Sequence, residues 1–299
     1  MIIMDILIVS NTTKNNYSCI KDIIRNNNIS FGTIDTYADQ IKEFEYVIAG
    51  REPYTSEILS ESNLKVISRC GHGTDAIDND YCSKNGIKVL DARGALDDTM
   101  ADITIGYIIM SLRRLCSIDT MTRRDGWMPL IGNDLTGKTV GIIGLGGIGT
   151  AVAKRLQCFR TNTLFYDIDR NKHHDYEYAK FLSLDELYKR SDVITLHCDL
   201  NKGNKNMIDR NVFEKMKDGS LLINTARGGL VDTTELRFAI IRKDIHAVLD
   251  VYPEEPLNDS LLRKIKNIIL GSHSACYSIE GQKKLAIKAA ENMIGVLNG

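Results

Sequence analysis

The feature that most constrains the fold of this chain is a glycine-rich loop set between an apolar run and a helical pattern. Gly144-Leu-Gly146-Gly-Ile-Gly149 directly follows the run Val140–Ile143. It opens a segment in which Ile148, Val152 and Leu156 recur at helical spacing on one face. A buried strand that turns through glycines straight into a helix begins a strand–helix–strand unit, which favours a parallel α/β sheet.

The three spaced glycines of this loop predict a binding site for the phosphates of a dinucleotide. Gly144 allows the tight turn, Gly146 lets backbone amides approach a pyrophosphate, and Gly149 permits close packing of the helix on the strand. The unpaired N–H groups and the dipole at the helix N-terminus favour an anion there. The position of the glycines between strand and helix, rather than the pattern alone, carries this prediction.

An acidic residue at the end of the next predicted strand supports the nucleotide prediction. Asp167 follows the segment Thr163–Tyr166, about 20 residues beyond Gly144 as such sites require. A carboxylate there accepts hydrogen bonds from the ribose hydroxyls and repels a 2′-phosphate, so NAD is preferred to NADP. Arg170 lies close enough in sequence to soften that preference. The alternative, that Asp167 is an ordinary solvated strand end, remains open.

Short β-branched runs alternate with longer helical patterns from one end of the chain to the other. In the first third, the predicted strands are Ile2–Val9, Tyr46–Ala49, Lys65–Ser68 and Ile87–Leu90. In the remainder they are Thr139–Ile143, Thr163–Tyr166, Val193–His197, Ser220–Asn224, His246–Val251 and Ile268–Leu270. Parallel neighbours need crossover connections, so strands separated by helices indicate parallel sheets with helices on both faces. We therefore predict an α/β protein with two doubly wound parallel sheets.

The length of the chain and two long helical patterns predict two domains. Single hydrophobic cores stop growing at about 250–300 residues, and this chain has 299. Apolar residues at helical spacing over Thr99–Leu115 suit a helix that joins the two halves, and a second pattern over Gln282–Leu297 could return the chain to the first. We expect one domain over residues 1–98 plus 276–299 and the other over residues 99–275.

The composition argues against several classes of protein. With 38 basic and 39 acidic residues, the chain gives no electrostatic reason to expect nucleic acid or an anionic membrane as partner. Seven scattered cysteines without a Cys-x-x-Cys pair argue against a zinc site and suit free thiols in a reducing cytosol. The first residues lack the basic region of a signal peptide, and no stretch approaches the roughly 18 apolar residues of a membrane span. We expect a cytoplasmic protein without a metal site.

Three polar side chains follow three successive strands of the second predicted sheet. Arg227, Glu255 and His273 come after the strands that begin at residues 220, 246 and 268. Ligands of an open α/β sheet bind outside the carboxyl ends of its strands, so we expect these side chains at the same edge as the glycine loop. Hydride transfer to a 2-oxo acid needs these three types: an Arg to hold the carboxylate and polarise the carbonyl, a His to deliver the proton, and a Glu to favour the imidazolium.

Each of these residues also has a purely structural interpretation. Arg227 could cap a strand end or pair with a surface acid, and Glu255 could be an ordinary charge in a proline-rich loop. His273 could be a hydrogen-bonded loop residue. His197, which closes another buried strand, is at such a position as often structural as functional. Their arrival at one sheet edge favours the catalytic interpretation.

Five stretches of the chain match one family pattern in the order that the family has them. They are Ser68-Arg-Cys-Gly-His-Gly-Thr-Asp-Ala-Ile-Asp78, Leu135-Thr-Gly-Lys-Thr-Val-Gly-Ile-Ile-Gly-Leu-Gly146, Asn224-Thr-Ala-Arg-Gly-Gly229, Leu249-Asp-Val-Tyr-Pro-Glu-Glu-Pro256 and Gly271-Ser-His273. On these residues the chain resembles the D-isomer-specific 2-hydroxyacid dehydrogenases, and among them most the phosphoglycerate dehydrogenase group. The resemblance runs over nearly the whole chain.

The resemblance implies an NAD-dependent oxidoreductase that interconverts a D-2-hydroxy acid and its 2-oxo acid, phosphorylated substrates such as 3-phosphoglycerate included. It implies a Rossmann nucleotide-binding domain and a smaller flavodoxin-like substrate domain with a cleft between them. It also implies a homodimer built on the nucleotide domain, with a contribution from the arm around Leu112–Trp127. In the family pattern, Arg227, Glu255 and His273 take the catalytic roles given above.

The resemblance also extends the predicted cofactor site beyond the glycine loop. It places Asp250 near the nicotinamide carboxamide and His197 along the cofactor. The predicted NAD contacts are Gly144, Gly146, Gly147, Ile148, Gly149, Asp167, His197, Cys198, Thr225, Ala226, Asp250 and Thr99.

The substrate contacts that the resemblance implies come from the smaller domain. The loop Cys70–Gly73 would supply backbone amides to the substrate carboxylate, where glycine permits close approach. His72 stands where the group usually has an apolar residue, and Arg93 falls in Asp91-Ala-Arg-Gly94 where the group commonly reads Asn-Thr-Pro-Gly. We therefore expect a substrate with additional negative charge or polar groups, unless these are ordinary surface charges. The predicted substrate contacts are Gly71, His72, Gly73, Arg51 and Arg93.

A second function stays open beside the enzyme. Some relatives of this fold bind NAD(H) as redox-sensing modules and act through partner proteins. Within the superfamily, formate dehydrogenases carry Gln where this chain has Glu255, which disfavours formate, whereas phosphite dehydrogenases keep the same three residues. Neither the particular hydroxy acid nor the physiological direction follows from the residues.

Overall fold

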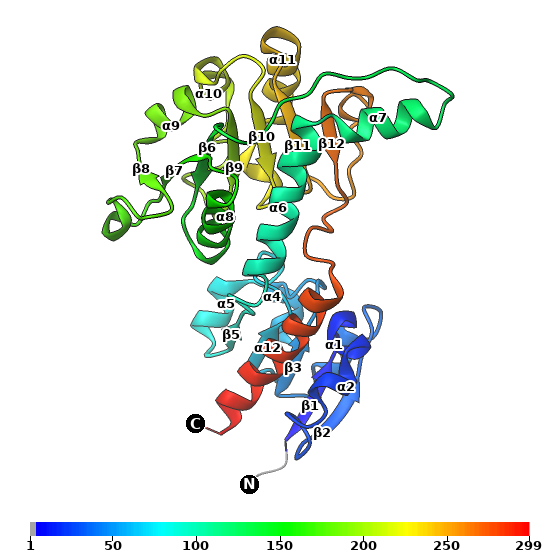
Figure 1. Ribbon diagram of the computed structural model, residues 1–299. Coiled ribbons are helices and arrows are strands. Elements are labelled where there is room, and N and C mark those ends of the chain that lie inside the picture. The colour runs from blue at the N-terminus through cyan, green and yellow to red at the C-terminus, as the bar shows by residue number, and fades with distance from the viewer. Residues whose placement is uncertain (1–3, 299) are drawn as a thin grey trace. The chain divides into compact units, whose positions relative to one another are not determined.

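The computed structural model describes residues 4–298 and divides the chain into two compact units (Figure 1). The smaller unit consists of the described residues up to Leu96 and from Cys276 onward, and the larger unit spans Asp97–Ala275. Within residues 4–298, no helix combines the length and the apolar character that crossing a bilayer demands.

The smaller unit is built on a parallel sheet with the strand order β2-β1-β3-β4-β5. This is the flavodoxin-like order, so the predicted fold class is confirmed for this unit. Of the predicted strand Ile2–Val9, the first two residues lie outside the described part of the chain. The strands are β1 (Asp5–Ile8), β2 (Asn28–Phe31), β3 (Tyr46–Ala49), β4 (Val66–Arg69) and β5 (Lys88–Leu90).

Helices cover the sheet of the smaller unit, and the last helix of the chain is one of them. Leu7 and Ile67 lie in one buried cluster with Leu59 of α4. The long helix α12 packs on β3, β4 and β5, where the Ser68 hydroxyl donates to the Ala289 carbonyl at 2.7 Å. The C-terminal helix therefore belongs to the smaller unit. Its helices are α1 (Asn11–Asn15), α2 (Tyr17–Ile20), α3 (Tyr37–Gln40), α4 (Ser56–Ser60), α5 (Asn79–Lys84) and α12 (Ile279–Leu297).

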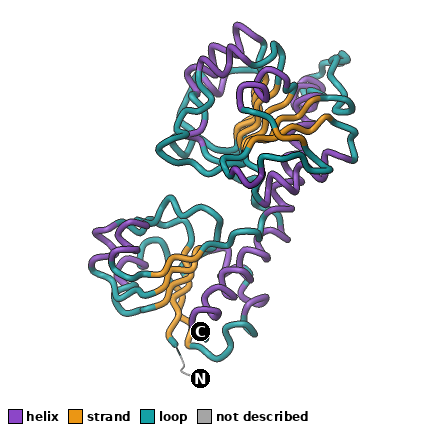
Figure 2. Tube along the Cα trace, turned by 90° about the vertical axis from the view of Figure 1, so that its left-hand side faces the viewer, coloured by secondary structure: helices purple, strands orange, loops and turns teal. Residues whose placement is uncertain are grey.

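The larger unit is built on a parallel sheet with the order β12-β11-β10-β9-β6-β7-β8. The glycine loop follows β6, at the point where the strand order reverses, and this is where the fold binds nucleotides. The Rossmann prediction is confirmed, and Figure 2 shows the strands of each unit gathered between helices. The strands are β6 (Thr139–Ile143), β7 (Asn162–Tyr166), β8 (Lys180–Phe181), β9 (Val193–Leu196), β10 (Leu221–Asn224), β11 (His246–Leu249) and β12 (Ile268–Leu270).

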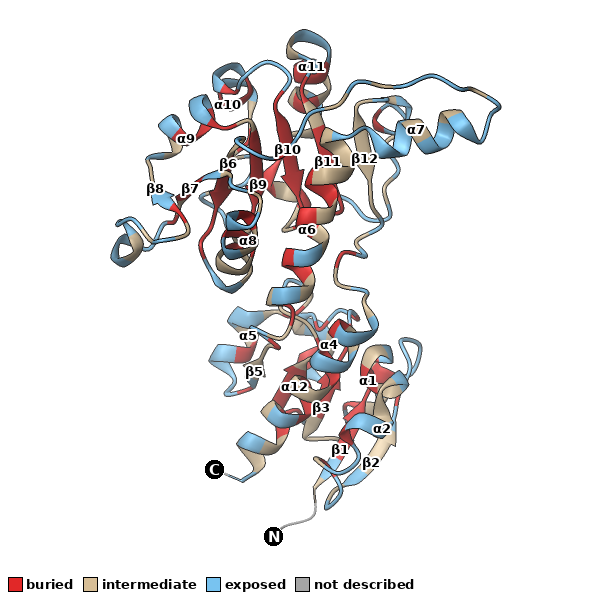
Figure 3. Cartoon of the chain, viewed as in Figure 1, coloured by how far each residue is buried: buried red, intermediate tan, exposed pale blue. Residues whose placement is uncertain are grey.

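Both faces of the larger sheet are buried. Successive side chains of each strand point to opposite faces, and helices cover each face. Leu222 lies in a core with residues of α9, α10 and α11, whereas Leu221 and Ile223 lie in another core with residues of α6 and α8. Figure 3 shows the central strands as buried and α7 as mostly exposed. The helices are α6 (Asp97–Leu112), α7 (Leu115–Thr122), α8 (Gly147–Gln157), α9 (Leu184–Arg190), α10 (Arg210–Lys215) and α11 (Thr233–Lys243), with short 3-10 turns η1 (Arg170–Lys172), η2 (Gly228–Leu230) and η3 (Leu262–Lys264).

Two edge strands were missing from the sequence prediction. β2 covers four residues, none of them buried, and β8 covers two. An edge strand buries little, so it needs neither a β-branched run nor a clean alternation of apolar residues. Asn26-Asn-Asn28, at the start of β2, also has the composition of a turn.

Candidate active site

The glycine loop that joins β6 to α8 has the geometry that its sequence predicts. Gly144 has a φ of +95°, and a Cβ there would lie 2.6 Å from the carbonyl oxygen of His197. A Cβ at Gly149 would lie 2.0 Å from the carbonyl oxygen of Gly144. Glycine is therefore required at both positions, at the first for the turn and at the second for the close packing of α8 on β6.

The N-terminus of α8 has room for a phosphate. A Cβ added at Gly146 would meet no atom within 4 Å, so the space beside the loop amides is open. The first turn of α6 packs against the same loop, because a Cβ at Gly147 would lie 2.0 Å from an Asp97 carboxylate oxygen. Thr99 belongs to that turn of α6. This end of α8 suits a pyrophosphate, and the predicted contact Thr99 is near it.

Asp167 follows β7 directly and lies beside the glycine loop. Its Oδ2 accepts a hydrogen bond from the Leu145 amide at 2.7 Å, and its Oδ1 accepts one from the Asp169 amide at 2.9 Å. Burial raises the pKa of this carboxyl, but hydrogen bonds from the two amides and from Lys172 outweigh burial, and the net pKa is lowered. The Asp167 carboxylate is therefore held in its charged form next to the loop.

The end of β9 contributes two neutral side chains. Burial lowers the pKa of His197 to about 4, so its imidazole is uncharged at neutral pH and is no source of protons. Its Nε2 lies 2.9 Å from the hydroxyl oxygen of Thr195. Burial raises the pKa of Cys198 to about 11, which keeps the thiol protonated. Both residues adjoin the glycine loop as candidate contacts rather than as acid–base groups.

A buried hydroxyl at this edge of the sheet has no hydrogen-bond partner among residues 4–298. Thr225 follows β10, is 7% exposed, and its Oγ1 contacts no described donor or acceptor. An unpaired buried polar group costs about 1–3 kcal/mol of stability. Such a group is expected where a bound ligand supplies the missing hydrogen-bond partner. The next residue, Ala226, is held by its amide, which donates to Asn224 Oδ1 at 3.1 Å. The loop, Asp167 and Thr225 together fit a bound dinucleotide.

His273 and Glu255 form a direct hydrogen-bonded pair. The Nδ1 atom of His273 lies 2.6 Å from Oε2 of Glu255, and both side chains are 34% exposed. Glu255 is itself oriented by the Tyr252 amide, which donates to its Oε1 at 3.1 Å. The contact at Nδ1 directs the other ring nitrogen of His273, Nε2, away from the carboxylate. This is the arrangement that a proton-donating histidine needs.

Arg227 lies on a loop that packs against the loop of Glu255. The side-chain amide of Asn224 donates to the Arg227 carbonyl at 2.8 Å, which holds the turn after β10. A Cβ at Gly228 would lie 1.9 Å from the carbonyl carbon of Tyr252, so the two loops are in backbone contact. Since β10, β11 and β12 are neighbours in the sheet, the residues that follow them share one edge. The structure thus brings together the elements that carry Arg227, Glu255 and His273.

The candidate substrate residues lie at the carboxyl edge of the other sheet. Arg51 follows β3, the segment 70–73 follows β4, and Arg93 follows β5, three neighbouring strands. The Ala92 amide donates to the Gly71 carbonyl at 2.9 Å, which joins the last two loops. Arg51 stacks over the ring of Tyr277 with 5.4 Å between Cζ and the centroid. The Arg93 guanidinium lies 3.5 Å from a carboxylate oxygen of Asp91.

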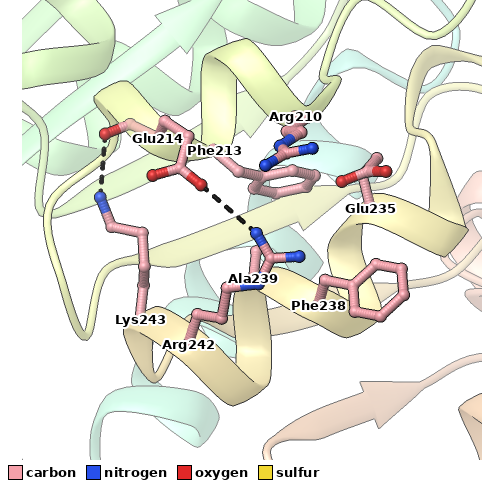
Figure 4. Close-up of a pocket in the computed structure, with 8 residues that line it drawn as sticks. All are labelled: Arg210, Phe213, Glu214, Glu235, Phe238, Ala239, Arg242 and Lys243. Carbon is pink, nitrogen blue, oxygen red and sulfur yellow. Dashed lines mark hydrogen bonds and ion pairs between the residues drawn. The ribbon is translucent and has the colours of Figure 1, made fainter.

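A separate hollow on the larger unit carries none of the predicted site residues. It lies between α10 and α11 and is shown in Figure 4. Arg242 lies over the Phe238 ring, 5.2 Å from its centroid, and its guanidinium is 3.7 Å from a Glu214 carboxylate oxygen. With Arg242 of α11 paired to Glu214 of α10, this hollow is a feature of helix packing. Its lining residues are Arg210, Phe213, Glu214, Glu235, Phe238, Ala239, Arg242 and Lys243.

Comparison with known proteins identifies the family of this chain. Residues 105–275 match the family described as "D-isomer specific 2-hydroxyacid dehydrogenase, NAD binding domain", and this is more than half of the chain. The chain belongs to the D-isomer specific 2-hydroxyacid dehydrogenase family. The match spans the glycine loop and all three candidate catalytic residues.

Relatives of this dehydrogenase include reductases of small 2-oxo acids. A glyoxylate reductase of Thermofilum pendens is 40% identical over 249 residues, which cover 79% of this chain and 73% of the relative. A hydroxypyruvate reductase of Thermotoga maritima is 33% identical over 254 residues, covering 83% and 82%. The crystal structure of D-lactate dehydrogenase from Aquifex aeolicus, complexed with NAD and lactic acid, aligns with a TM-score of 0.86 and 26% identity over 99% of this chain and 96% of that one.

These matches support the main predictions about activity and cofactor. The chain is an NAD-dependent D-2-hydroxyacid dehydrogenase, and NAD is its cofactor. The prediction of the phosphoglycerate group is only partly supported. A D-3-phosphoglycerate dehydrogenase of Archaeoglobus fulgidus is 34% identical, below the glyoxylate reductase of Thermofilum pendens.

The sequence prediction of this dehydrogenase site missed Tyr107, which acts on the loop of His273 through the predicted cofactor residue Asp250. Asp250 is 1% exposed and accepts hydrogen bonds from the amides of Ser274 at 3.2 Å and Ala275 at 2.9 Å. Tyr107 of α6 hydrogen-bonds the same carboxylate, and burial together with the charge of Asp250 raises the pKa of Tyr107 to about 12. Tyr107 is thus a neutral donor. It recurs at helical spacing with core residues, so no sequence pattern indicates this contact.

Removing the Tyr107 hydroxyl tests whether this contact orders the loop of His273. In Tyr107→Phe, the buried Asp250 carboxylate loses a donor, and we expect the free energy of unfolding to fall by about 1.5–3 kcal/mol. We also expect kcat for 2-oxo acid reduction to fall about tenfold, because the loop that places His273 loses one of its supports. Urea unfolding and steady-state kinetics measure the two effects.

A matched variant on the same helix separates loop order from general stability. Thr104 is fully buried, and its hydroxyl donates to the Met100 carbonyl at 2.7 Å within α6, away from Asp250. Thr104→Val should therefore lower stability and leave kcat near that of the parent enzyme. Equal losses of kcat in both variants would show that Tyr107 has no particular effect on the loop.

Proposed function

We propose that this enzyme reduces a short 2-oxo acid of the glyoxylate or hydroxypyruvate type with NADH and forms the corresponding D-2-hydroxy acid. Residues 97–275 would bind the cofactor, and the smaller unit would supply the loop 70–73 to the substrate carboxylate. Reductases of these two acids are among the relatives, at 40% and 33% identity. A polar or phosphorylated 2-oxo acid is the second candidate, favoured by Arg51 and Arg93 at the strand ends.

The proposed roles of the residues account for the hydride, the proton and the substrate carboxylate of the reaction. NADH held along the glycine loop would supply the hydride. His273 gives the proton on Nε2 to the carbonyl oxygen, and the Glu255 carboxylate stabilises the imidazolium that this step requires. Arg227 holds the carboxylate and polarises the carbonyl with its planar fork of donors. The 2.6 Å contact between His273 and Glu255 is the observation that carries the proposal.

A substrate panel tests the proposed activity. The full-length protein is incubated with NADH and glyoxylate, hydroxypyruvate, pyruvate or 3-phosphohydroxypyruvate, and the loss of NADH absorbance is followed. We expect the highest kcat/KM with glyoxylate or hydroxypyruvate. A preference for the phosphorylated acid would support the charged-substrate alternative. Binding of NADH without any turnover would favour the redox-sensing module instead.

We also propose that the enzyme is a homodimer that uses the arm after α6. Figure 1 shows α7 and the chain that follows it extending from the rest of the larger unit. This arm carries exposed apolar side chains: Trp127 is 92% exposed, Met128 62% and Ile131 90%. Apolar groups so exposed on one segment are typical of a surface that a partner covers. A second copy of the same chain is the partner that the family resemblance favours.

Polar substitution of the arm tests the homodimer. Burying a Trp or Ile side chain contributes about 1.5–3 kcal/mol, so the double variant Trp127→Ser/Ile131→Ser should weaken the dimer at least about a hundredfold. Sedimentation velocity at micromolar protein measures the change. Ile241→Ser is the control, because Ile241 is 80% exposed but lies on α11. A monomeric parent protein, or a double variant that stays dimeric, would contradict the proposal.

A reducing compartment remains our proposal for where the enzyme works. No disulfide joins any of the seven cysteines, all of which lie within residues 4–298, and they are scattered over both units. Free thiols in such number are typical of the cytoplasm.

A further inference from the structure

Lys172 lies against Asp167, the acidic residue proposed to bind the cofactor ribose. Its Nζ is 3.2 Å from Oδ2 of Asp167 and donates to the Leu145 carbonyl, also at 3.2 Å. The same Oδ2 accepts the Leu145 amide at 2.7 Å. The ammonium group is therefore attached both to the carboxylate and to the backbone of the glycine loop.

The turn that carries Lys172 is held in place by hydrogen bonds. Asp169 caps it, since its carboxylate accepts the Asn171 amide at 3.0 Å and its carbonyl accepts the Lys172 amide at 3.0 Å. On the far side of Lys172, the His173 ring is fixed by a contact of 2.7 Å between its Nε2 and the Asp167 carbonyl oxygen. These contacts return the chain to Asp167 and hold Lys172 beside it.

The positive charge of Lys172 affects whether Asp167 can exclude NADP from the cofactor site. An acid at this position selects NAD because its negative charge repels the 2′-phosphate of NADP. Asp167 is 8% exposed, and its charge is opposed by an ammonium group in direct contact. The Asp167–Lys172 pair has no net charge with which to repel a phosphate. The ammonium group has three N–H donors, so it can keep its hydrogen bond to the Asp167 carboxylate and donate another N–H to a phosphate oxygen.

We infer that Lys172 is a specificity-determining residue that makes this enzyme accept NADP(H) as well as NAD(H). Its Nζ neutralises Asp167 and pairs with the 2′-phosphate. The inference rests on the proposed site for the cofactor along the glycine loop. It assigns to Lys172 the effect that the sequence alone suggested for Arg170, which lies on the same turn.

Direct binding measurements test the inference without reference to catalysis. The Kd values of NADH and NADPH are measured by nicotinamide fluorescence for the parent protein and for Lys172→Met, Lys172→Arg and Lys180→Met. We expect the parent protein to bind both cofactors, and the ratio of the NADPH Kd to the NADH Kd to rise at least about tenfold in Lys172→Met, equivalent to about 1.4 kcal/mol. Lys172→Arg keeps the charge and should keep the parent ratio.

The control lysine removes the same charge from a nearby surface. Lys180 begins β8 and is exposed, so Lys180→Met should leave the ratio within about twofold of the parent value. High salt should weaken NADPH binding more than NADH binding in the parent protein, because the phosphate contact is ionic and exposed to screening.

Each outcome decides for or against Lys172. If the parent protein binds NADH but not NADPH, or if Lys172→Met weakens both cofactors equally, Lys172 only supports Asp167 and the inference is wrong. A ratio that rises equally in Lys172→Arg also contradicts it, because the positive charge is kept there. A parent protein that binds neither cofactor would refute the proposed function itself, and this result is distinct from the others.

Discussion

His273→Asn should lower kcat/KM for reduction of the preferred 2-oxo acid by about 10²–10⁴, the usual contribution of a positioned acid–base group. The Glu255 contact at Nδ1 orients the imidazole, and His197 cannot replace it as a proton donor at neutral pH, since burial lowers the pKa of His197 to about 4. Stopped-flow and steady-state assays from pH 5.5 to 9 measure the loss.

The choice of asparagine keeps the backbone of the loop intact. His273 has a φ of 54°, in the left-handed region, where Asn is tolerated better than Ala or Gln. His273→Asn should therefore remove the acid–base group without moving the loop, and the Kd of NADH should stay within about twofold of the parent value. Ser272→Ala, in the same exposed segment, is the control for disturbance of the loop. A variant at position 273 that keeps more than a tenth of the parent activity would refute the proposed role.

Much of the fold could be predicted because its signals are local or follow from topology. The strands of the larger sheet are short β-branched runs buried on both faces, and the glycines of the loop are required by a positive φ and by close packing. The catalytic candidates could be predicted from the sequence for another reason. In a parallel sheet, the residues that follow neighbouring strands must share an edge, so Arg227, Glu255 and His273 could be grouped without coordinates.

What the sequence did not reveal depends on contacts between distant segments. Tyr107 occupies a core-like position on α6, and only the packing of that helix brings its hydroxyl to Asp250, far along the chain. Lys172 looks like any exposed lysine until the turn after β7 folds back on Asp167. The edge strand β2 was missed because an edge buries too little to require an apolar pattern. Each of these features is set by tertiary packing rather than by local propensity.

Arg227→Lys should lower kcat/KM for the 2-oxo acid by about 10²–10³, the effect expected from the loss of a preorganised donor to a developing oxyanion. Lysine keeps the positive charge but lacks the planar fork that matches a carboxylate and a carbonyl oxygen together. The turn itself should persist, because Asn224 holds the Arg227 carbonyl and Gly228 packs on the backbone of Tyr252, and neither contact involves the side chain at 227. The Kd of NADH, measured by fluorescence, should be little changed.

Two further measurements distinguish a geometric role of Arg227 from a merely electrostatic one. In Arg227→Ala, added guanidinium ion should restore part of the activity, whereas an alkylammonium ion should not, because only the former presents paired donors. Arg237→Lys is the matched control in the same unit, since Arg237 pairs with Asp259 at 2.7 Å and touches none of the three candidate catalytic residues. It should lose stability rather than turnover. Full activity in Arg227→Lys would mean that a point charge suffices at this position, and the proposed two-point hold on the substrate would then be wrong.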